Sequence, residues 1–440
     1  MLKTFKIINL FGQFNYDLQL FDSGITILTG PNGFGKSTIL KIIEAIGEKD
    51  LYELNCFQFD DLSATLDNGK VLHIVKNQDS ILVNDVILKI PNKRVIENLE
   101  RRREVPFIER IGPREYIDLR DNTILSFEEV QEIRMHYERD RIIKDRLIYL
   151  NLDIAKRNKT SQSPLKALDK FLYDFKNDLG PIKFIKEQRL LRKEVSEDEY
   201  YPHKKEIAVE VINEIPEKIK NEIKNVVLKY SEVSSRLDSS FPKRLFSTKE
   251  GISQKDYLEN LGELILRQEK VQVYKLLNDF KNFSTDYIET YSQALRVYLQ
   301  DTKQKLEVFD DLIKHLDVFT DIVNKKLNFK RIAVSNEKGL MVLRDDGTEL
   351  EASKLSSGEQ QIIVLYYELI FGVKDKLMLL IDEPEISLHV AWQRELLNDF
   401  HKIIELKNGH LNLLIATHAP QVIDSNWDLV IDLGEKYGVR

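Results

Sequence analysis

The chain has 440 residues and a mass of 51.5 kDa, enough for two or three structural units with sizeable hydrophobic cores. Its 65 basic and 72 acidic residues give a net charge of −7, which excludes a bulk electrostatic grip on nucleic acid but leaves room for local basic patches. The one cysteine, Cys56, excludes an internal disulfide framework and a Cys-x-x-Cys zinc site, and we expect it in the core.

The pattern of apolar residues predicts neither a membrane-spanning segment nor a signal peptide. No apolar run approaches the roughly 18 residues of a membrane span, and residues 1–6 are typical of a strand rather than a signal peptide. We therefore expect a cytoplasmic protein with no membrane partner.

The first strands are predicted from alternation of apolar and polar residues. Residues 5–8 and 17–20 alternate around Gly12 and predict an antiparallel pair. The β-branched, apolar residues 25–29 then predict a buried parallel strand.

Residues 30–38 follow the phosphate-loop pattern G-x-x-x-x-G-K-[ST], between that strand and residues spaced for a helix face. Glycines let backbone N–H groups meet phosphate oxygens, and the helix N-terminus and Lys36 add positive charge near the β- and γ-phosphates. Ser37 is placed to hold Mg²⁺. The alternative is a glycine-rich turn that matches by chance. The predicted ATP-binding residues are Asn32, Gly33, Phe34, Gly35, Lys36, Ser37 and Thr38.

Three further strands are predicted after this helix, at residues 56–59, 62–66 and 71–75, with a hairpin turn at 67–70. Gln58 lies between apolar neighbours on the first of them. It is a candidate to reach the metal or its water, and a purely structural role is equally favoured.

A long helical region is predicted from about residue 95. Residues 127–160 and 206–328 are charged and helix-periodic. Between them, residues 182–185 alternate like a strand, which we place on the globular part. Strand patterns resume at 331–334 and 340–343. We predict an N-terminal half of a globular head over 1–95, an inserted helical region over 96–325 from which 180–192 returns to the head as a strand, and a C-terminal half over 326–440.

The last hundred residues predict a parallel sheet. Residues 355–360 open a helix, in which Ser356 and Glu359 form a capping box that also presents N–H groups to an anion. Nothing in the local pattern requires Gly358. Apolar strands at 377–381 and 411–416 flank a helix near 391–407, so their carboxyl ends meet at one edge of the sheet.

Polar residues at those strand ends supply the chemistry of hydrolysis. Asp382 can hold Mg²⁺ directly or through water, and Glu383 can polarise a water that attacks the γ-phosphate. His418 can hydrogen-bond the γ-phosphate. The residue taken by itself, however, favours a structural histidine whose hydrogen bonds are made within the protein. We predict a magnesium-dependent ATPase with Glu383 and His418 as catalytic residues.

In order and context, residues 30–38, 355–360, 379–383 and 417–418 resemble the motifs of ABC-type ATPase heads. The likeness is closest to the SMC/RecF/overcoming-lysogenisation-defect group, which has helices inserted between the halves of the head. It covers residues 1–95, 180–192 and 325–440. It implies an α/β fold: an ABC-type P-loop ATPase head, with a mixed sheet and flanking helices, and a large inserted helical or coiled-coil region.

The resemblance also implies a homo-oligomer, at least a head-to-head dimer. Ser356 and Gly358 of one chain would touch the γ-phosphate held by Lys36 of another. Gln58 and His418 would sense that phosphate, and residues 385–389 would lie along the contact. Transporter cassettes have L-S-G-G-Q here, so Ser357 and Glu359 depart from the family pattern. The predicted ATP-binding residues of this signature segment are Ser356, Ser357, Gly358 and Glu359.

Residues 184–190, the signature segment and residues 382–389 look like the stand-alone ATPase subunits of anti-phage systems such as PARIS and Septu. This favours an ATP-dependent switch that controls a separate effector, such as a TOPRIM or HNH nuclease, because we expect no nuclease domain after the last predicted strand. The alternative is a DNA-repair or DNA-tethering ATPase. Its DNA path would use basic clusters at 101–103, 110 and 114, or at 186, 189, 192 and 193, where a solvated face is the favoured interpretation. A transporter cassette fits poorly with the long insert.

Overall fold

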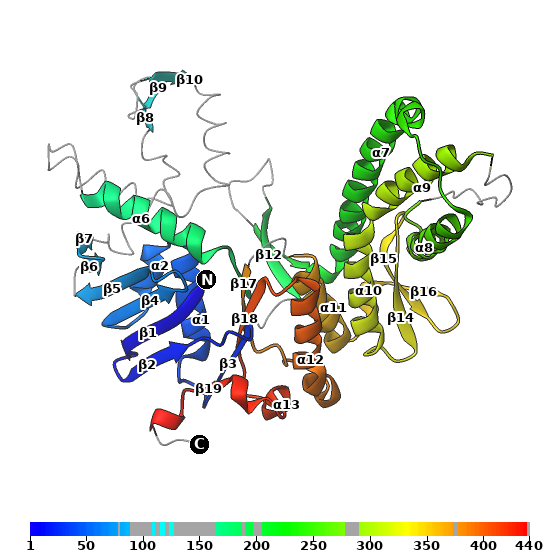
Figure 1. Cartoon of the computed structure of the whole chain (residues 1–440). Helices are drawn as coiled ribbons and strands as arrows, with labels where there is room; N and C mark the ends of the chain where they lie inside the picture. The colour runs from blue at the N-terminus through cyan, green and yellow to red at the C-terminus, as the bar shows by residue number, and fades with distance from the viewer. Residues whose placement is uncertain are drawn as a thin grey trace. The chain divides into compact units, whose positions relative to one another are not determined.

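The computed structural model describes residues 1–77, 80–88, 108–110, 115–118, 123–126, 164–186, 190–196, 205–277, 290–372 and 377–437. Their contacts divide the chain into two units (Figure 1). Unit 1 comprises Met1–Lys186, Asp375–Pro384 and His410–Arg440, and unit 2 comprises Glu187–Lys374 and Glu385–Gly409. The helices predicted over 127–160 lie outside the described residues, and the domain boundaries stay a prediction.

A five-stranded parallel sheet carries the phosphate loop in unit 1. Its strand order is β11-β17-β18-β3-β19, and every neighbouring pair is parallel. All six residues of β17 are buried, as expected for a strand covered on both faces. The strands are β3 (Ile25–Thr29), β11 (Ile182–Ile185), β17 (Leu377–Asp382), β18 (Leu411–Ala416) and β19 (Val430–Asp432). The predicted strand at 182–185 thus pairs with the predicted strand that ends at Asp382.

An antiparallel sheet forms the second layer of unit 1, with the order β2-β1-β4-β5-β6-β7. Burial alternates along β2 and β4, because one face meets the core and the other meets solvent. The strands are β1 (Leu2–Leu10), β2 (Phe14–Gln19), β4 (Asp61–Leu66), β5 (Val71–Asn77), β6 (Ser80–Val83) and β7 (Val86–Leu88). The predicted antiparallel pair β1–β2 and the turn after β4 are confirmed.

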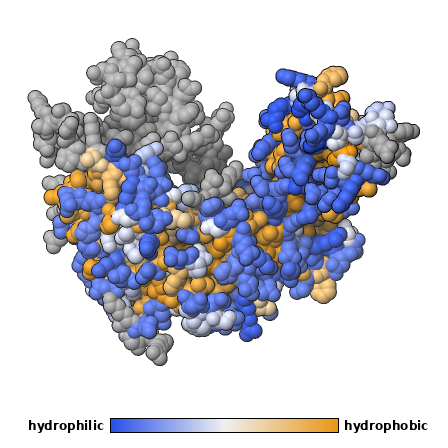
Figure 2. Space-filling view, viewed as in Figure 1, coloured by the Kyte–Doolittle hydropathy of each residue, from blue (hydrophilic) through white to orange (hydrophobic). Residues whose placement is uncertain are grey.

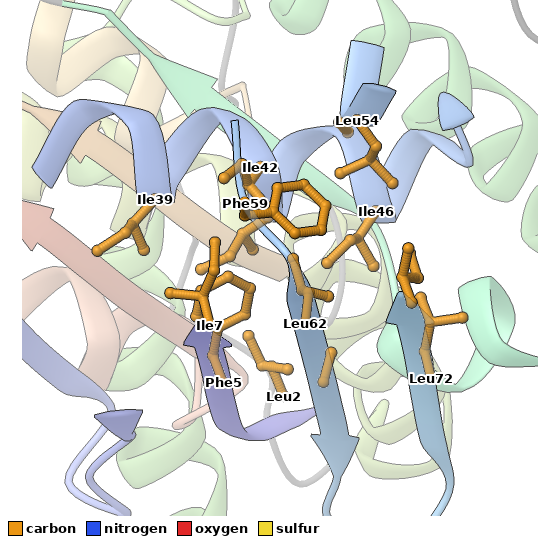
Figure 3. Close-up of a cluster of buried hydrophobic side chains, with 14 of the residues drawn as sticks. Leu2, Phe5, Ile7, Ile39, Ile42, Ile46, Leu54, Phe59, Leu62 and Leu72 are labelled. Carbon is orange, nitrogen blue, oxygen red and sulfur yellow. The ribbon is translucent and has the colours of Figure 1, made fainter. Parts of the chain in front are cut away.

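The core of unit 1 lies between this sheet and the helix that follows the phosphate loop. Helix α1 (Lys36–Glu48) presents Ile39, Ile42 and Ile46 to the sheet. Figure 3 shows these side chains facing Phe5 of β1 and Leu62 of β4. Helices α2 (Leu51–Cys56) and α6 (Pro164–Leu179) add to the same cluster. Burial of these apolar groups anchors the start of α1, and with it the phosphate loop.

Two predictions near residue 56 are wrong. Asp50 accepts a hydrogen bond from Glu53 N and so caps α2, which runs to Cys56; residues 57–60 are a loop rather than a strand. Cys56 at the end of this helix is exposed and not in the core. Gln58 is therefore a loop residue.

The described residues of unit 2 form helices and two small antiparallel sheets. The hairpin β12 (Leu191–Ser196) and β13 (Lys205–Glu210) precedes the helices, and β14 (Lys330–Ser335), β15 (Gly339–Arg344) and β16 (Glu349–Leu350) follow them. The helices are α7 (Ile215–Ser247), α8 (Gln254–Val273), α9 (Ser292–Glu307), α10 (Asp310–Asn324), α11 (Ser357–Ile370) and α12 (Val390–Leu406). Helices were predicted over 206–328. The described residues from Ile215 to Asn324 are largely helical, but residues 206–210 belong to strand β13, so the prediction is wrong there. The strands predicted at 331–334 and 340–343 are confirmed.

The remaining described elements are short. Strands β8 (Ile108–Arg110), β9 (Glu115–Asp118) and β10 (Thr123–Ser126) pair with one another, and α13 (Pro420–Ile423) follows β18. Arg101–Arg103, Arg114 and Arg189 lie outside the described residues. Among the described helices, none has the length and apolar character needed to cross a membrane.

Candidate ATPase site

The phosphate loop joins β3 to α1 through three glycines with positive φ: Gly30 at 138°, Gly33 at 86° and Gly35 at 89°. A Cβ on Gly33 would have no atom within 4 Å, so the crest of the loop is open. A Cβ on Gly35 would lie 2.7 Å from Cδ2 of Leu10. Gly35 is thus required by both its backbone conformation and its close packing on β1.

No side chain of the described residues caps the N-terminus of α1. Its N-cap is Gly35, which offers no side-chain hydrogen bond. Uncapped amides at a helix N-terminus, together with the helix dipole, form a site for anions. The loop geometry and this helix end therefore fit a phosphate group.

Lys36 lies across the loop. The residue is only 6% exposed, and its Nζ donates hydrogen bonds to the carbonyl oxygens of Gly30 at 2.7 Å and Pro31 at 3.2 Å. A buried ammonium needs such oxygen partners. Phosphate oxygens are stronger partners for a charged donor than these neutral carbonyls.

An aromatic cluster that includes residues of β2 contacts the phosphate loop, and it is not among the site residues predicted from the sequence. Tyr16 OH donates a hydrogen bond of 2.8 Å to the carbonyl oxygen of Phe34. Burial, aided by the neighbouring Tyr437, raises the pKa of Tyr16 above its ordinary value, so this donor keeps its proton. The Phe34 ring also packs on Phe14, with centroids 4.9 Å apart. Alternation on β2 marks Phe14 and Tyr16 as inward-facing, but their contact with the loop is not local in sequence.

Ser37 and Asp382 meet at the carboxyl end of β17. Ser37 Oγ donates a hydrogen bond of 2.9 Å to Asp382 Oδ1, across 345 positions of the sequence. Asp382 is 6% exposed. A hydroxyl and a carboxylate beside a phosphate cradle are the hard oxygen ligands that Mg²⁺ prefers, so these residues fit the metal.

Glu383 and His418 form a second pair at the same sheet edge. Glu383 Oε1 lies 2.7 Å from Nε2 of His418. His418 is the second residue after the end of β18. Glu383 has a φ of 46°, and its backbone N donates to the carbonyl oxygen of Ala416 at 2.9 Å. Left-handed backbone is costly for a glutamate and is held here by the surrounding structure, as is common in active sites.

Gln58 packs against the loop that joins β1 and β2. Its carbonyl oxygen accepts a hydrogen bond from Phe11 N at 3.0 Å, and its Nε2 would be 3.2 Å from a Cβ on Gly12. The Phe11 ring would in turn be 3.3 Å from a Cβ on Gly35. Gln58 is thus near the phosphate loop, and a contact between Gln58 and a metal stays a prediction.

The signature segment lies in unit 2 and begins α11. Ser356 is its N-cap, and the predicted capping box is confirmed: Ser356 Oγ accepts from Glu359 N, and Glu359 accepts from Ser356 N. Ser356 and Ser357 are exposed, whereas Gly358 is buried. A Cβ on Gly358 would lie 2.6 Å from the carbonyl oxygen of Ser387. Nothing local in the sequence requires Gly358, but the structure does, because the backbone at the distant Ser387 packs against it and leaves no room for a side chain.

Glu359 has a second partner, Lys330 of β14. Lys330 Nζ lies 2.8 Å and 2.9 Å from the two carboxylate oxygens. Burial by itself would raise the pKa of Glu359, but the bonds from Lys330 and Ser356 outweigh it and hold the pKa below its ordinary value. The carboxylate is thus ionised and neutralised within its own unit.

These arrangements define a P-loop ATPase. Unit 1 contains the phosphate loop together with Ser37, Asp382, Glu383 and His418. The signature segment, residues 356–359, belongs to unit 2. The family model described as "AAA ATPase domain" matches residues 1–423, and the chain belongs to that family. The predicted fold class, a mixed α/β ATPase head, is confirmed.

Relatives match over shorter stretches. UvrABC system protein A from Rickettsia typhi and from Rickettsia prowazekii are each 30% identical to the chain over 112 residues. The matched part covers 26% of this chain and 11% of those proteins, so the chain corresponds to about a tenth of their length.

Solved structures that match over nearly the whole chain at low identity include two SMC head domains. The Smc head domain of Pyrococcus furiosus, with an extended coiled coil and bound to the C-terminal domain of ScpA, is 11% identical with a TM-score of 0.35, covering 98% of this chain and 92% of that one. The SMC head domain of Thermotoga maritima is 10% identical with a TM-score of 0.32, covering 96% and 91%.

Proposed function

We propose that the chain hydrolyses ATP in a magnesium-dependent reaction at the edge of the parallel sheet in unit 1. The hydrogen bond from Ser37 to Asp382 carries this proposal, because it joins the phosphate loop to the strand-end carboxylate. Residues 32–38 would bind the phosphates through backbone amides and Lys36. Ser37 and Asp382, with Gln58 as a further candidate, would hold Mg²⁺. When bound, the metal would neutralise charge on the phosphates.

The Glu383–His418 pair is the proposed catalytic group. Glu383 would accept a proton from the attacking water, because its carboxylate follows directly on the proposed metal ligand. His418, at 2.7 Å, would fix the orientation of that carboxylate and reach toward the γ-phosphate. The left-handed backbone at Glu383 supports a functional role over a simple turn.

Assembly through ATP is the second part of the proposal. Ser356, exposed at the start of α11, and the backbone at Gly358 would meet the γ-phosphate bound by a second copy of the chain. Glu359 departs from the family pattern, but Lys330 neutralises its carboxylate and so reduces repulsion of a phosphate. ATP would then join two heads, and hydrolysis would release them.

The biological setting that we propose is anti-phage defence. The ATPase would act as a switch subunit that holds or releases a separate effector, with a nuclease of TOPRIM or HNH type as the expected partner. The resemblance of the signature segment and of residues 382–389 to the PARIS and Septu subunits supports this setting. The test is copurification of the neighbouring gene products with the Glu383→Gln protein loaded with ATP. We expect one of them to be retained with ATP and lost without it; retention of none would count against the effector.

A DNA-repair or DNA-tethering ATPase is the second candidate. The local likeness to UvrABC system protein A over 112 residues favours it. Phosphate release measured with and without duplex DNA, at two salt concentrations, separates the candidates. A DNA-dependent ATPase would be stimulated at low salt and much less at high salt, because DNA binding releases counterions. The defence switch without a DNA site would give equal rates in all four conditions.

A further inference from the structure

Helix α8 of unit 2 has two apolar faces, and in the part of the chain that the structure describes only one of them is buried. Tyr257, Leu261, Leu264 and Val271 are buried on the first face. On the second face, Leu258 is 48% exposed, Leu266 is 63% exposed and Val273 is 70% exposed. Figure 2 shows hydrophobic residues at the surface among hydrophilic ones in the region of α7, α8 and α9. An exposed apolar stripe on a helix is typical of a partner site.

The order of residues along this stripe is symmetric about Gly262. Leu258 and Leu266 lie four residues before and after it, and Lys255 and Glu269 lie seven before and after it. Positions four and seven apart share one face of a helix. Lys255, Gly262 and Glu269 are exposed, and a Cβ on Gly262 would have no atom within 4 Å.

We infer that α8 is the contact of an antiparallel homodimer, whose two-fold axis passes beside Gly262. A two-fold axis places each residue opposite the position equally far on the other side of the centre. Leu258 of one copy then meets Leu266 of the other, and each Lys255 meets a Glu269. Gly262 meets Gly262, where the missing side chains let the helices approach closely. The partner that fits this charge and shape pattern is a second copy of the chain.

This contact is distinct from the proposed ATP-dependent one. It uses α8 rather than the phosphate loop or the signature segment, and its pairing needs no nucleotide. A contact one helix wide is small, so we expect a dissociation constant in the micromolar range. It would raise the local concentration of heads and so favour their joining by ATP.

Sedimentation velocity of the full chain without nucleotide, in the Lys36→Ala background, tests the inference. We expect a concentration-dependent rise toward twice the 51.5 kDa of the chain. Leu266→Glu should abolish the rise, and melting followed by circular dichroism should be unchanged because the side chain is exposed. Lys255→Glu alone and Glu269→Lys alone should each weaken the dimer at least about tenfold, since each places like charges together twice.

Mixing the two charge-reversed proteins is the sharper test. In a mixed dimer, each contact again joins a lysine and a glutamate, so an equimolar mixture should recover the affinity of the parent. A mixture as weak as its components would overturn the inference. A chain that stays monomeric, or a dimer unaffected by Leu266→Glu, would overturn it too.

A cysteine cross-link locates the axis directly. In the Cys56→Ser background, Gly262→Cys should form a disulfide-linked dimer under mild oxidation, because the two copies meet at the axis. The matched control, Val273→Cys, lies on the same stripe but about 33 Å from its own copy in an antiparallel pair. Cross-linking of both positions, or of Val273→Cys alone, would show a different arrangement and contradict the inference. Failure of Gly262→Cys to cross-link would also contradict it.

Discussion

Ser37 at the start of α1 donates a hydrogen bond of 2.9 Å to Asp382 at the end of β17. The two residues are brought together because β17 and β3 belong to one parallel sheet, separated only by β18. Strand ends at such an edge collect ligands. The proposed ATPase chemistry depends on this pair more than on any other contact.

The proposed contact of Lys36 with the phosphates predicts that replacing Lys36 weakens ATP binding. Lys36→Ala should weaken ATP binding roughly 100-fold, because a charged donor to the phosphates is lost. Lys41→Ala is the matched control, since Lys41 is exposed on the same helix. Titration calorimetry with ATP and Mg²⁺ measures both. Equal affinities of the two variants would show that Lys36 does not bind phosphate.

The contributions of Glu383 and His418 to ATP hydrolysis should depend on each other. Glu383→Gln should lower ATP turnover by roughly 10² to 10⁴ while ATP binding is kept, because only proton acceptance is removed. His418→Ala should cost about tenfold by itself and add little in the Glu383→Gln background. Phosphate release by the parent, the two single variants and the double variant gives a double-mutant cycle, with Glu435→Gln as a surface control. Additive losses would contradict the proposed positioning of Glu383 by His418.

A buried charge network predicts where unit 2 is sensitive to mutation. Lys326 Nζ lies 2.6 Å from Asp399 Oδ2, which also accepts a 2.6 Å hydrogen bond from Tyr366 OH. Asp399→Ala should lower the free energy of unfolding by about 3 to 5 kcal/mol, because it leaves a buried ammonium with less compensation. Lys402→Ala, which removes an exposed partner of Asp399 at 3.7 Å, should cost less than about 1 kcal/mol. Urea unfolding of each variant measures the difference, and similar losses would contradict the assignment.

Lys407 predicts a pH dependence of stability. Burial lowers the pKa of Lys407 from 10.5 to about 8, while its Nζ contacts His315 Nε2 at 2.8 Å and the carbonyl oxygen of Ile370 at 2.7 Å. Between pH 8 and 10.5 the unfolded state binds more protons at this group than the folded state, so its contribution to the free energy of unfolding rises with pH. Below pH 8 the buried charge is a constant cost.

The measurement for Lys407 is urea unfolding from pH 7 to pH 10.5, compared with Lys407→Met. Any stability advantage of Lys407→Met near pH 7 should shrink as the pH rises through this window. Lys249→Met, at an exposed site, controls for the general titration of lysines. A difference between Lys407→Met and the parent that does not change with pH would contradict the prediction.

Much of the fold was predictable because its signals are local. The buried strand before the loop, the glycines, Lys36 and Ser37 follow one another in sequence, and apolar strands ending in Asp382 and before Thr417 predict a parallel sheet. The capping box at Ser356 is also local. Its spacing alone predicts both hydrogen bonds that the structure contains.

Contacts between distant segments could not be predicted. The requirement for Gly358 comes from Ser387, and the partner of Glu359 is Lys330 on another strand. The hydrogen bond from Tyr16 to the phosphate loop likewise depends on how β2 packs. The strand at 56–59 was wrongly predicted because four alternating apolar and polar residues do not distinguish a helix end and loop from a strand. Cys56 was expected in the core only because free cysteines are usually buried.

The most direct test is phosphate release from ATP by the purified chain and by Asp382→Asn, each with Mg²⁺ and with EDTA. We expect turnover by the parent with Mg²⁺, none above background with EDTA, and a loss of at least about 100-fold in Asp382→Asn. Unchanged folding of the variant by circular dichroism completes the comparison. Equal turnover by the two proteins, or turnover by the parent that persists in EDTA, would contradict a magnesium-dependent site built on Ser37 and Asp382.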